Sequence, residues 1–211
     1  MILIAACLVA FFFGSIPFGY LIGRVFYGID IRTQGSGNIG AANALRTMGK
    51  TGAAAVLALD ALKGFLPVFF SRMFFSDPAI HAATASAAVL GHCFSPWLAG
   101  RGGKGVATSV GAIFALSWAA GIVSAGGWVA GAGATAFSSV GSLLANALAP
   151  FTLWYFTRRP AYVAYGVFAA VLIVYTHREN IGRLLHGREH TLPLLRPWRK
   201  RNEGNPDRAS Y

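Results

Sequence analysis

Long segments without charge are the feature that most limits what this chain of 211 residues can fold into. The first 23 residues carry no charged side chain, and neither does the stretch from 106 to 157. Charged residues make up 12% of the chain, whereas soluble globular proteins carry about 25%. A helix needs about 20 apolar residues to cross a bilayer core of about 30 Å. The pattern predicts an all-α, polytopic integral membrane protein and excludes soluble, disordered and collagen-like classes.

The apolar segments predict seven transmembrane helices in one membrane-embedded domain, residues 1–191, followed by a basic cytoplasmic tail, residues 192–211. Two of these helices are expected to be short and to meet at a serine-rich turn, Ser138–Ser142. A short amphipathic helix around Ile181–Leu185 is expected to lie on the inner leaflet. The seven predicted helices cover 1–23, 52–71, 79–99, 106–123, 125–138, 142–157 and 161–176.

The basic residues lie between the apolar segments, in three stretches: Arg24–Lys50, Arg101–Lys104 and Arg178–Arg208. Cytoplasmic loops carry an excess of Lys and Arg, so we expect the N-terminus outside and the C-terminus in the cytoplasm. Six helices would place the basic tail outside and are the second choice. Basic surfaces that face anionic lipid or phosphorylated substrates account for the net charge of +11. No nucleic-acid partner is therefore predicted.

The first basic loop contains a cluster of glycines and amide side chains. Three glycines within Gly35–Gly40 allow backbone N–H groups to turn toward an anion. Ser36, Asn38 and Asn43 add neutral hydrogen-bond partners, and Arg46 adds a planar guanidinium suited to phosphate. A flexible turn with a basic anchor is the equally compatible structural interpretation.

A second glycine-rich segment, Gly100–Gly105, stands directly before an apolar helix. Free N–H groups at a helix N-terminus favour anions, and Lys104 adds a positive charge. The segment lacks the glycine and the hydroxyl residue of a nucleotide P-loop, because Leu98 and Gly105 stand at those positions. The segment therefore predicts a phosphate cradle but no nucleotide site. The alternative is a loop whose basic side chains reach the membrane–water interface.

Two further groups of polar residues adjoin the membrane. His177 and Asn180 are three residues apart, hence on one helix face, and can present a base and an amide to one ligand. Asp60 and Lys63 are expected within the second span, where they can pair with each other and support the basic loops. The cysteines and the remaining histidines form no metal-ligand pattern, so neither a metal nor another cofactor is predicted.

Together, these segments resemble one family, the bacterial acyl-phosphate:glycerol-3-phosphate acyltransferases. The likeness runs from about residue 14 to 190 and includes Ser15–Tyr20, Leu59–Gly64 and Gly91–Thr108, besides Ser138–Ser142 and Thr176–Ile181. This chain has Asn38-Ile39-Gly40-Ala41-Ala42-Asn43 where the family usually has Asn-Pro-Gly-Ala-Thr-Asn, and Arg101 where lysine is common.

The resemblance implies an enzyme of the bacterial inner membrane that works at the cytoplasmic face. It would move a fatty acyl group from acyl phosphate to the C1 hydroxyl of sn-glycerol 3-phosphate, releasing inorganic phosphate and lysophosphatidic acid, the first acylation of phospholipid synthesis. Membrane lipid surrounds such an enzyme. The residues expected to hold donor phosphate are Ser36, Gly37, Asn38, Asn43, Gly102, Gly103, Lys104 and Gly105. Those expected to bind and orient the acceptor are Arg46, Lys104, Ser142, His177 and Asn180, of which the last four are the expected catalytic group.

Two questions stay open at this stage. The proton of the acceptor hydroxyl can pass to His177 or to a substrate phosphate. A transporter for phosphate or organic anions is the alternative function, since short helices that meet in mid-chain can mark a transport site. The basic groups are expected on a single face and no inverted repeat is apparent, which favours the enzyme.

Overall fold

The computed structural model describes residues 1–193, and in that range all regular structure is helical. Of the predicted tail, only residues 192 and 193 fall within it. The helices of the N-terminal part are α1 (Ile2–Gly14), α2 (Phe18–Phe26), the 3₁₀-helix η1 (Ile31–Thr33), α3 (Ala41–Thr47), α4 (Gly49–Phe74), α5 (Pro78–Cys93) and the 3₁₀-helix η2 (Pro96–Leu98). Those that follow are α6 (Val106–Leu116), α7 (Trp118–Thr135), α8 (Ser138–Ala147), α9 (Ala149–Thr157), α10 (Pro160–Thr176) and α11 (Arg178–Leu185).

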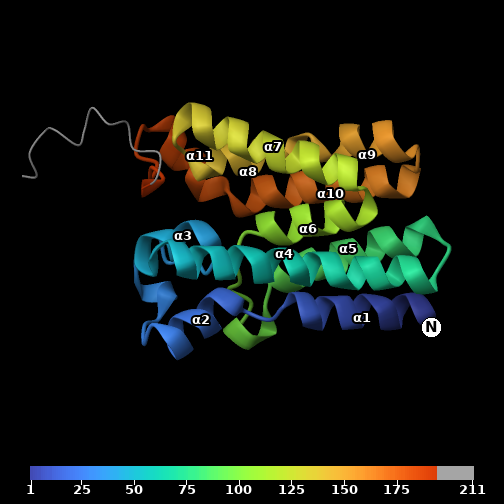
Figure 1. The fold of residues 1–211 in the computed structure, drawn as a ribbon, viewed down its shortest axis with the longest axis horizontal. Coiled ribbons are helices and arrows are strands. Elements are labelled where there is room, and N and C mark those ends of the chain that lie inside the picture. Colours follow the sequence, from blue (N-terminus) through green and yellow to red (C-terminus); the bar gives the residue numbers. More distant parts are fainter. Residues whose placement is uncertain (194–211) are drawn as a thin grey trace, which may run out of the picture.

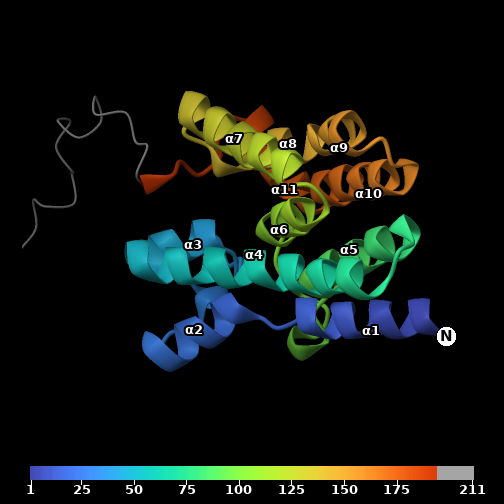
Figure 2. The same ribbon diagram turned by 45° about the vertical axis from the view of Figure 1, so that its right-hand side comes forward.

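The long helices lie along a common axis and form two groups, with α6 between them (Figures 1 and 2). One group contains α1 to α5, and the other contains α7 to α11. Along the axis, α4, α6, α8 and α9 run in one direction, and α1, α2, α5, α7 and α10 run in the other (Figure 1). Helices α3 and α11 therefore lie at the same end of the molecule, far from the N-terminus.

Two helical segments are long and apolar enough to cross a membrane by length and composition, Ile2–Phe26 and Gly49–Phe74. A third candidate is the pair Pro160–Thr176 and Arg178–Leu185, which is bent by 60°. Helices are confirmed over most of the predicted ranges 52–71, 79–99 and 161–176, although α5 ends at Cys93. The predicted short helix around Ile181–Leu185 is α11.

The predicted span over residues 1–23 falls within Ile2–Phe26, but it consists of two helices, because the chain breaks between α1 and α2 at Ser15–Pro17. Proline has no N–H to donate, so a helix rarely continues through it without leaving carbonyls unpaired. Here the hydroxyl of Ser95 donates to the carbonyl oxygen of Ser15 at 2.7 Å. The ammonium of Lys63 donates to that of Ile16, also at 2.7 Å. Distant residues thus stabilise a break inside an apolar segment.

The helices predicted within 106–157 also need correction. A helix over 106–123 is not formed: α6 ends at Leu116, and the hydroxyl of Ser117 accepts a hydrogen bond from the Ala120 N–H as the cap of α7. Helix α7 continues through most of the residues predicted for the next helix and ends at Thr135, and the capping residue Ala136 that follows has φ 63°. The predicted turn Ser138–Ser142 is instead the start of α8. Arg72 of α4 donates to the Ala115 carbonyl near the end of α6.

Small residues bring α4 and α6 into close contact, as is common between membrane helices. A Cβ atom on Gly64 would lie 1.9 Å from the carbonyl oxygen of Thr108. One on Gly111 would lie 2.0 Å from that of Ala61. Neither position can carry a side chain unless the helices separate. This contact fixes α6, and with it the glycine-rich turn that precedes α6.

Candidate active site

A cavity of about 690 Å³ is lined by residues of α3, α4, α6, α7, α8 and the junction of α10 with α11. It brings together residues from the three polar segments that the sequence singled out, although these are far apart along the chain. Gly37, Gly102 and Gly103 are the predicted site residues that do not line it. The predicted site residues that do are Ser36, Asn38, Asn43, Arg46, Lys104, Gly105, Ser142, His177 and Asn180.

Asn43 organises the first loop through its side-chain amide. The amide NH₂ donates to the carbonyl oxygens of Ile31, Gln34 and Asn38 at 3.1, 3.0 and 2.9 Å. The amide oxygen accepts from the backbone N–H of Ser36 at 2.8 Å. The Asn43 side chain is buried, with these loop groups as its partners. It therefore shapes the loop that presents Ser36 and Asn38 to the cavity.

The glycine-rich turn folds back onto the end of α5. The N–H groups of Gly102 and Gly103 donate to the carbonyls of Cys93 and His92, both at 3.1 Å. A Cβ atom on Gly103 would lie 2.1 Å from Nε2 of His92. These two amides are therefore occupied by the protein, which corrects the expectation that the whole Gly102–Gly105 turn faces a phosphate.

Lys104 and Gly105 form the part of this turn that opens onto the cavity. Gly105 has φ +87°, a left-handed conformation that glycine adopts without strain, and α6 begins at the next residue. The first N–H groups of a helix have no partner within it, and Gly105, Val106 and Ala107 at this helix start line the cavity, where such groups favour an anion. The Lys104 ammonium donates to the amide oxygen of Asn180. Burial, and then repulsion by Arg183, lower the pKa of Lys104 to about 8.

His177 caps α10 and is buried at the cavity wall. Its Nδ1 lies 2.9 Å from the carbonyl oxygen of Ile173. Because a carbonyl only accepts, this contact assigns the proton to Nδ1 and leaves a lone pair on Nε2. Burial, and then the charge of Lys104, lower the pKa of His177 to about 4. The imidazole is therefore neutral near pH 7 and can accept a hydrogen bond from a hydroxyl.

Ser142 lies on α8, and its side chain is buried at the wall of the cavity. Its hydroxyl donates to the Ser138 carbonyl one turn earlier, at 2.7 Å. The hydrogen of this hydroxyl is thus bonded within the helix, while its oxygen can still accept a hydrogen bond.

A segment after α11 closes one side of the cavity, and the sequence reasoning missed it. The Glu189 carboxylate accepts from the Asn180 amide at 2.5 Å and from Nε of Arg183 at 2.9 Å. Burial raises the pKa of Glu189, but the hydrogen bonds from Asn180 and Arg183 outweigh it, so the pKa is lowered overall. Arg46 donates from α3 to the carbonyls of His190 and Thr191, both at 3.4 Å. The acidic Glu189 among the basic residues that follow α11 was the available signal.

Beneath the cavity, Asp60 and Lys63 form the ion pair that their spacing predicts, with 2.8 Å between Oδ1 and Nζ. Both side chains are buried. His92, whose Nδ1 lies 3.7 Å from the same carboxylate oxygen, extends the group to the glycine turn. Lys63 also holds the break between α1 and α2 through Ile16. The group connects three parts of the fold around the cavity, and Asp60 and His92 line its floor.

Comparison with known protein families agrees with these features. A family model described as glycerol-3-phosphate acyltransferase matches residues 4–187. A curated relative of that name from Erythrobacter litoralis is 46% identical over 184 residues, which is 87% of this chain and 92% of the relative. Another from Thermotoga petrophila is 43% identical over 189 residues, covering 90% and 96% of the two chains.

Two solved structures share the fold. One is the crystal structure of PlsY, an integral membrane glycerol 3-phosphate acyltransferase, in its glycerol 3-phosphate form. It matches with a TM-score of 0.87 and 36% identity over 92% of this chain and 98% of that one. The lysophosphatidic acid form matches with a TM-score of 0.85 and 35% identity, covering 90% and 95% of the two chains. The expected all-α integral membrane architecture is thereby confirmed. The chain belongs to the family of integral membrane glycerol-3-phosphate acyltransferases.

Proposed function

We propose that this protein transfers a fatty acyl group from acyl phosphate to the C1 hydroxyl of sn-glycerol 3-phosphate. The products are 1-acyl-sn-glycerol 3-phosphate and inorganic phosphate. The single observation that carries the proposal is the shared cavity, in which Arg46, Lys104 and His177 meet from three separate segments. The printed names and ligand states of the related proteins supply the acceptor and the product class.

Both substrates carry phosphate, and the cavity offers a separate set of groups to each. On the side of the first loop, Ser36, Asn38 and the free amides at the start of α6 bind the donor phosphate, with Asn43 holding the loop. Near the segment that follows α11, the side chains of Arg46, Lys104 and Asn180 bind the phosphate of the acceptor. A phosphate leaving group develops charge during acyl transfer, and preorganised donors around it lower the barrier.

The wall of the cavity away from these polar groups is apolar. It is lined by Leu57 of α4, Val110 of α6, and Trp128 and Val129 of α7. Burying a sixteen-carbon chain is worth about 12 kcal/mol at about 0.8 kcal/mol per CH₂. The acyl chain of the donor therefore lies along this wall and in the adjoining bilayer, while its anhydride reaches the polar end.

His177 and Ser142 orient the acceptor hydroxyl toward the acyl carbon. The lone pair on Nε2 of His177 can take the hydroxyl proton, and so can a phosphate oxygen of a substrate. Replacing His177 by Ala distinguishes the two routes. If the imidazole takes the proton, turnover falls by about 10²–10⁴-fold. A loss of less than about tenfold, with an unchanged unfolding temperature, assigns the proton to substrate phosphate.

We propose seven spans in the bacterial inner membrane, with α1 and α2 forming one broken span and α8 and α9 another. The alternating helix directions in Figure 1 support this count and bring α3 and α11 to one end. The basic residues concentrated near that end support a cytoplasmic position. Cysteines placed at Ser36 and His177, in a background without Cys7 and Cys93, should react with impermeant reagent from the cytoplasmic side. Labelling from opposite sides would contradict the topology.

A reconstituted assay tests the reaction itself. Purified full-length protein in detergent should release phosphate and form lysophosphatidic acid only when palmitoyl phosphate and glycerol 3-phosphate are both present. Palmitoyl-CoA in place of palmitoyl phosphate serves as the control donor and should not react. Uptake of labelled glycerol 3-phosphate into sealed proteoliposomes without acyl donor would instead support a transporter.

A further inference from the structure

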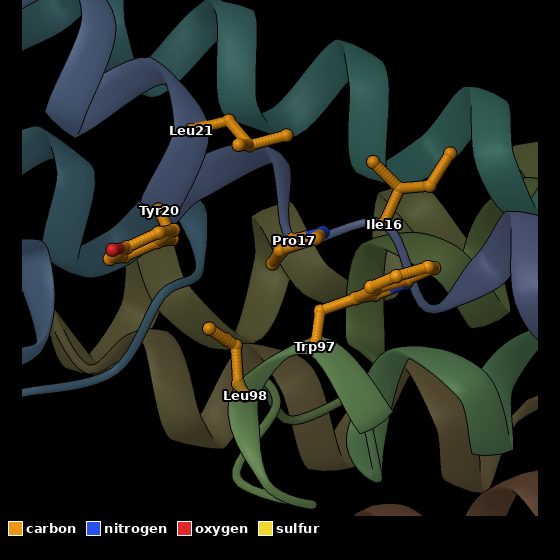
Figure 3. A pocket seen from close by; sticks show the side chains of 6 residues that line it. All are labelled: Ile16, Pro17, Tyr20, Leu21, Trp97 and Leu98. Atoms are coloured by element: carbon orange, nitrogen blue, oxygen red, sulfur yellow. The ribbon is translucent and has the colours of Figure 1, made fainter.

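A second cavity, of about 290 Å³, lies outside the candidate active site, where the break between α1 and α2 meets η2. Figure 3 shows its six lining side chains, with Tyr20 at one end and Trp97 and Ile16 at the other. The lining is apolar apart from the Tyr20 hydroxyl and the Trp97 N–H, and none of these residues lines the larger cavity. The six residues are Ile16, Pro17, Tyr20, Leu21, Trp97 and Leu98.

Hydrogen bonds hold in place both walls of this second cavity, which forms an apolar furrow. The indole N–H of Trp97 donates to the Ser15 hydroxyl at 2.8 Å. The Ser95 hydroxyl donates to the Ser15 carbonyl, and Lys63 donates to that of Ile16. The Trp97 side chain nevertheless leaves 62% of its residue surface exposed. The furrow is therefore a preformed apolar surface that faces outward from the helices.

Positive charge gathers at the Tyr20 end. The Arg32 guanidinium lies 4.6 Å from the centroid of the Tyr20 ring, and that of Arg24 lies 5.6 Å from it. Both pair with one carboxylate, that of Asp30, at 2.7 and 3.0 Å. Their side chains remain 41% and 49% exposed. Two cations that share one anion leave a positive charge at the surface, next to an apolar furrow.

Arg101 adds a third cation on the η2 side. Its backbone N–H donates to the Leu98 carbonyl at 3.0 Å, so the residue adjoins the furrow wall. It is exposed, and it forms no ion pair with any residue from 1 to 193. The same segment continues through Gly100–Gly105 to Lys104. A ligand that holds η2 in place therefore also acts on the segment that carries the candidate phosphate cradle.

We propose that this furrow binds one anionic phospholipid of the surrounding bilayer. One acyl chain lies between Leu21, Trp97 and Leu98, and the phosphate lies at Arg24, Arg32 and Arg101. A soluble anion lacks a group to fill the furrow. A zwitterionic lipid brings a cation toward an already positive rim, whereas basic residues near the membrane surface attract anionic lipid. The site is distinct from the cavity proposed for acyl transfer.

Fluorescence quenching tests the proposal on the full-length protein in detergent micelles. Phosphatidylglycerol and phosphatidylcholine, each with brominated acyl chains, are titrated, and the Trp97 signal is obtained by difference from Trp97→Phe. The anionic lipid should quench Trp97 at a concentration about tenfold lower than the zwitterionic lipid. The variant with both Arg24→Gln and Arg32→Gln should lose this preference. Arg101→Gln, which breaks no ion pair of the described residues, should reduce the preference about threefold.

Arg178→Gln is the matched control, because Arg178 stacks over Tyr175 at 4.8 Å in a similar way but borders no lining residue of the furrow. It should keep the full preference for phosphatidylglycerol. Equal quenching of the wild-type protein by both lipids would overturn the proposal and leave a furrow filled by any lipid chain. Preference retained in both the double variant and Arg101→Gln would also overturn it.

Discussion

Two lysines near the candidate site, Lys63 and Lys104, differ in what their charges contact. Lys63 is enclosed, with the Asp60 carboxylate and the Ile16 carbonyl as its partners. Lys104 contacts the neutral amide oxygen of Asn180 and faces the cavity. A lysine beside a carboxylate is neutralised within the protein, whereas one beside an amide retains its attraction for an incoming anion. We therefore expect Lys63 to stabilise the fold and Lys104 to bind a ligand.

The largest effect is expected when Lys63 is replaced by Met. Removing one partner of a buried ion pair leaves the other charge without compensation, which costs about 3–5 kcal/mol. The unfolding temperature in detergent should therefore fall steeply. The double variant with Asp60→Leu and Lys63→Met removes both charges and should recover much of the loss. A Lys63→Met protein as stable as the wild type would contradict a structural role for this lysine.

Replacing Lys104 by Ala should lower turnover and leave stability nearly unchanged. Loss of a preorganised donor to a phosphate costs about 10²–10³ in turnover, or about 2.7–4 kcal/mol. The unfolding temperature should stay close to that of the wild type, because Lys104 has no buried carboxylate partner. Arg178→Met, which alters an exposed cation outside the cavity, is the control and should keep normal turnover. Full activity in Lys104→Ala would remove this lysine from the phosphate site.

The pH dependence of kcat/KM tests the role of the Lys104 charge, with a smaller expected effect. Only the protonated Lys104 carries the charge that attracts phosphate, and its pKa is lowered to about 8. The value of kcat/KM, which reports the free enzyme, should be highest below pH 7. It should fall about tenfold between pH 7 and pH 9 as the lysine loses its proton.

Lys104→Met, which has no group to titrate at this position, controls for ionisation elsewhere. Its residual kcat/KM should not show the fall between pH 7 and pH 9. An identical fall in the variant and the wild type would assign the titration to another group.

The smallest effect is expected for Ser142→Ala. A neutral hydrogen bond contributes about 0.5–1.5 kcal/mol, so KM for glycerol 3-phosphate should rise by about two- to tenfold. Ser86→Ala is a matched control, since the Ser86 hydroxyl also donates one turn back, to the Ala82 carbonyl, but does not line the cavity. An unchanged KM in Ser142→Ala would exclude a direct contact with the acceptor.

The residues of the site were predictable to the extent that their chemistry is local. Glycines beside Lys104, and the spacing of His177 and Asn180, indicate anion binding within a few residues of chain. The role of Asn43 was not predictable in the same way, because its amide contacts carbonyls as far back as Ile31. Glu189 was missed because its partners lie on a helix that ends before it.

Hydropathy and charge alone determined that this chain is a helical membrane protein with basic, glycine-rich segments between its apolar stretches. Both properties are sums over neighbouring residues, so they can be read without the fold. Only the tertiary structure decided where the apolar stretches break. The break at Ser15–Pro17 is stabilised by hydrogen bonds from Ser95 and Lys63, which lie far along the chain. An unpaired backbone carbonyl is costly in an apolar environment, and the partner that removes this cost is found only after folding.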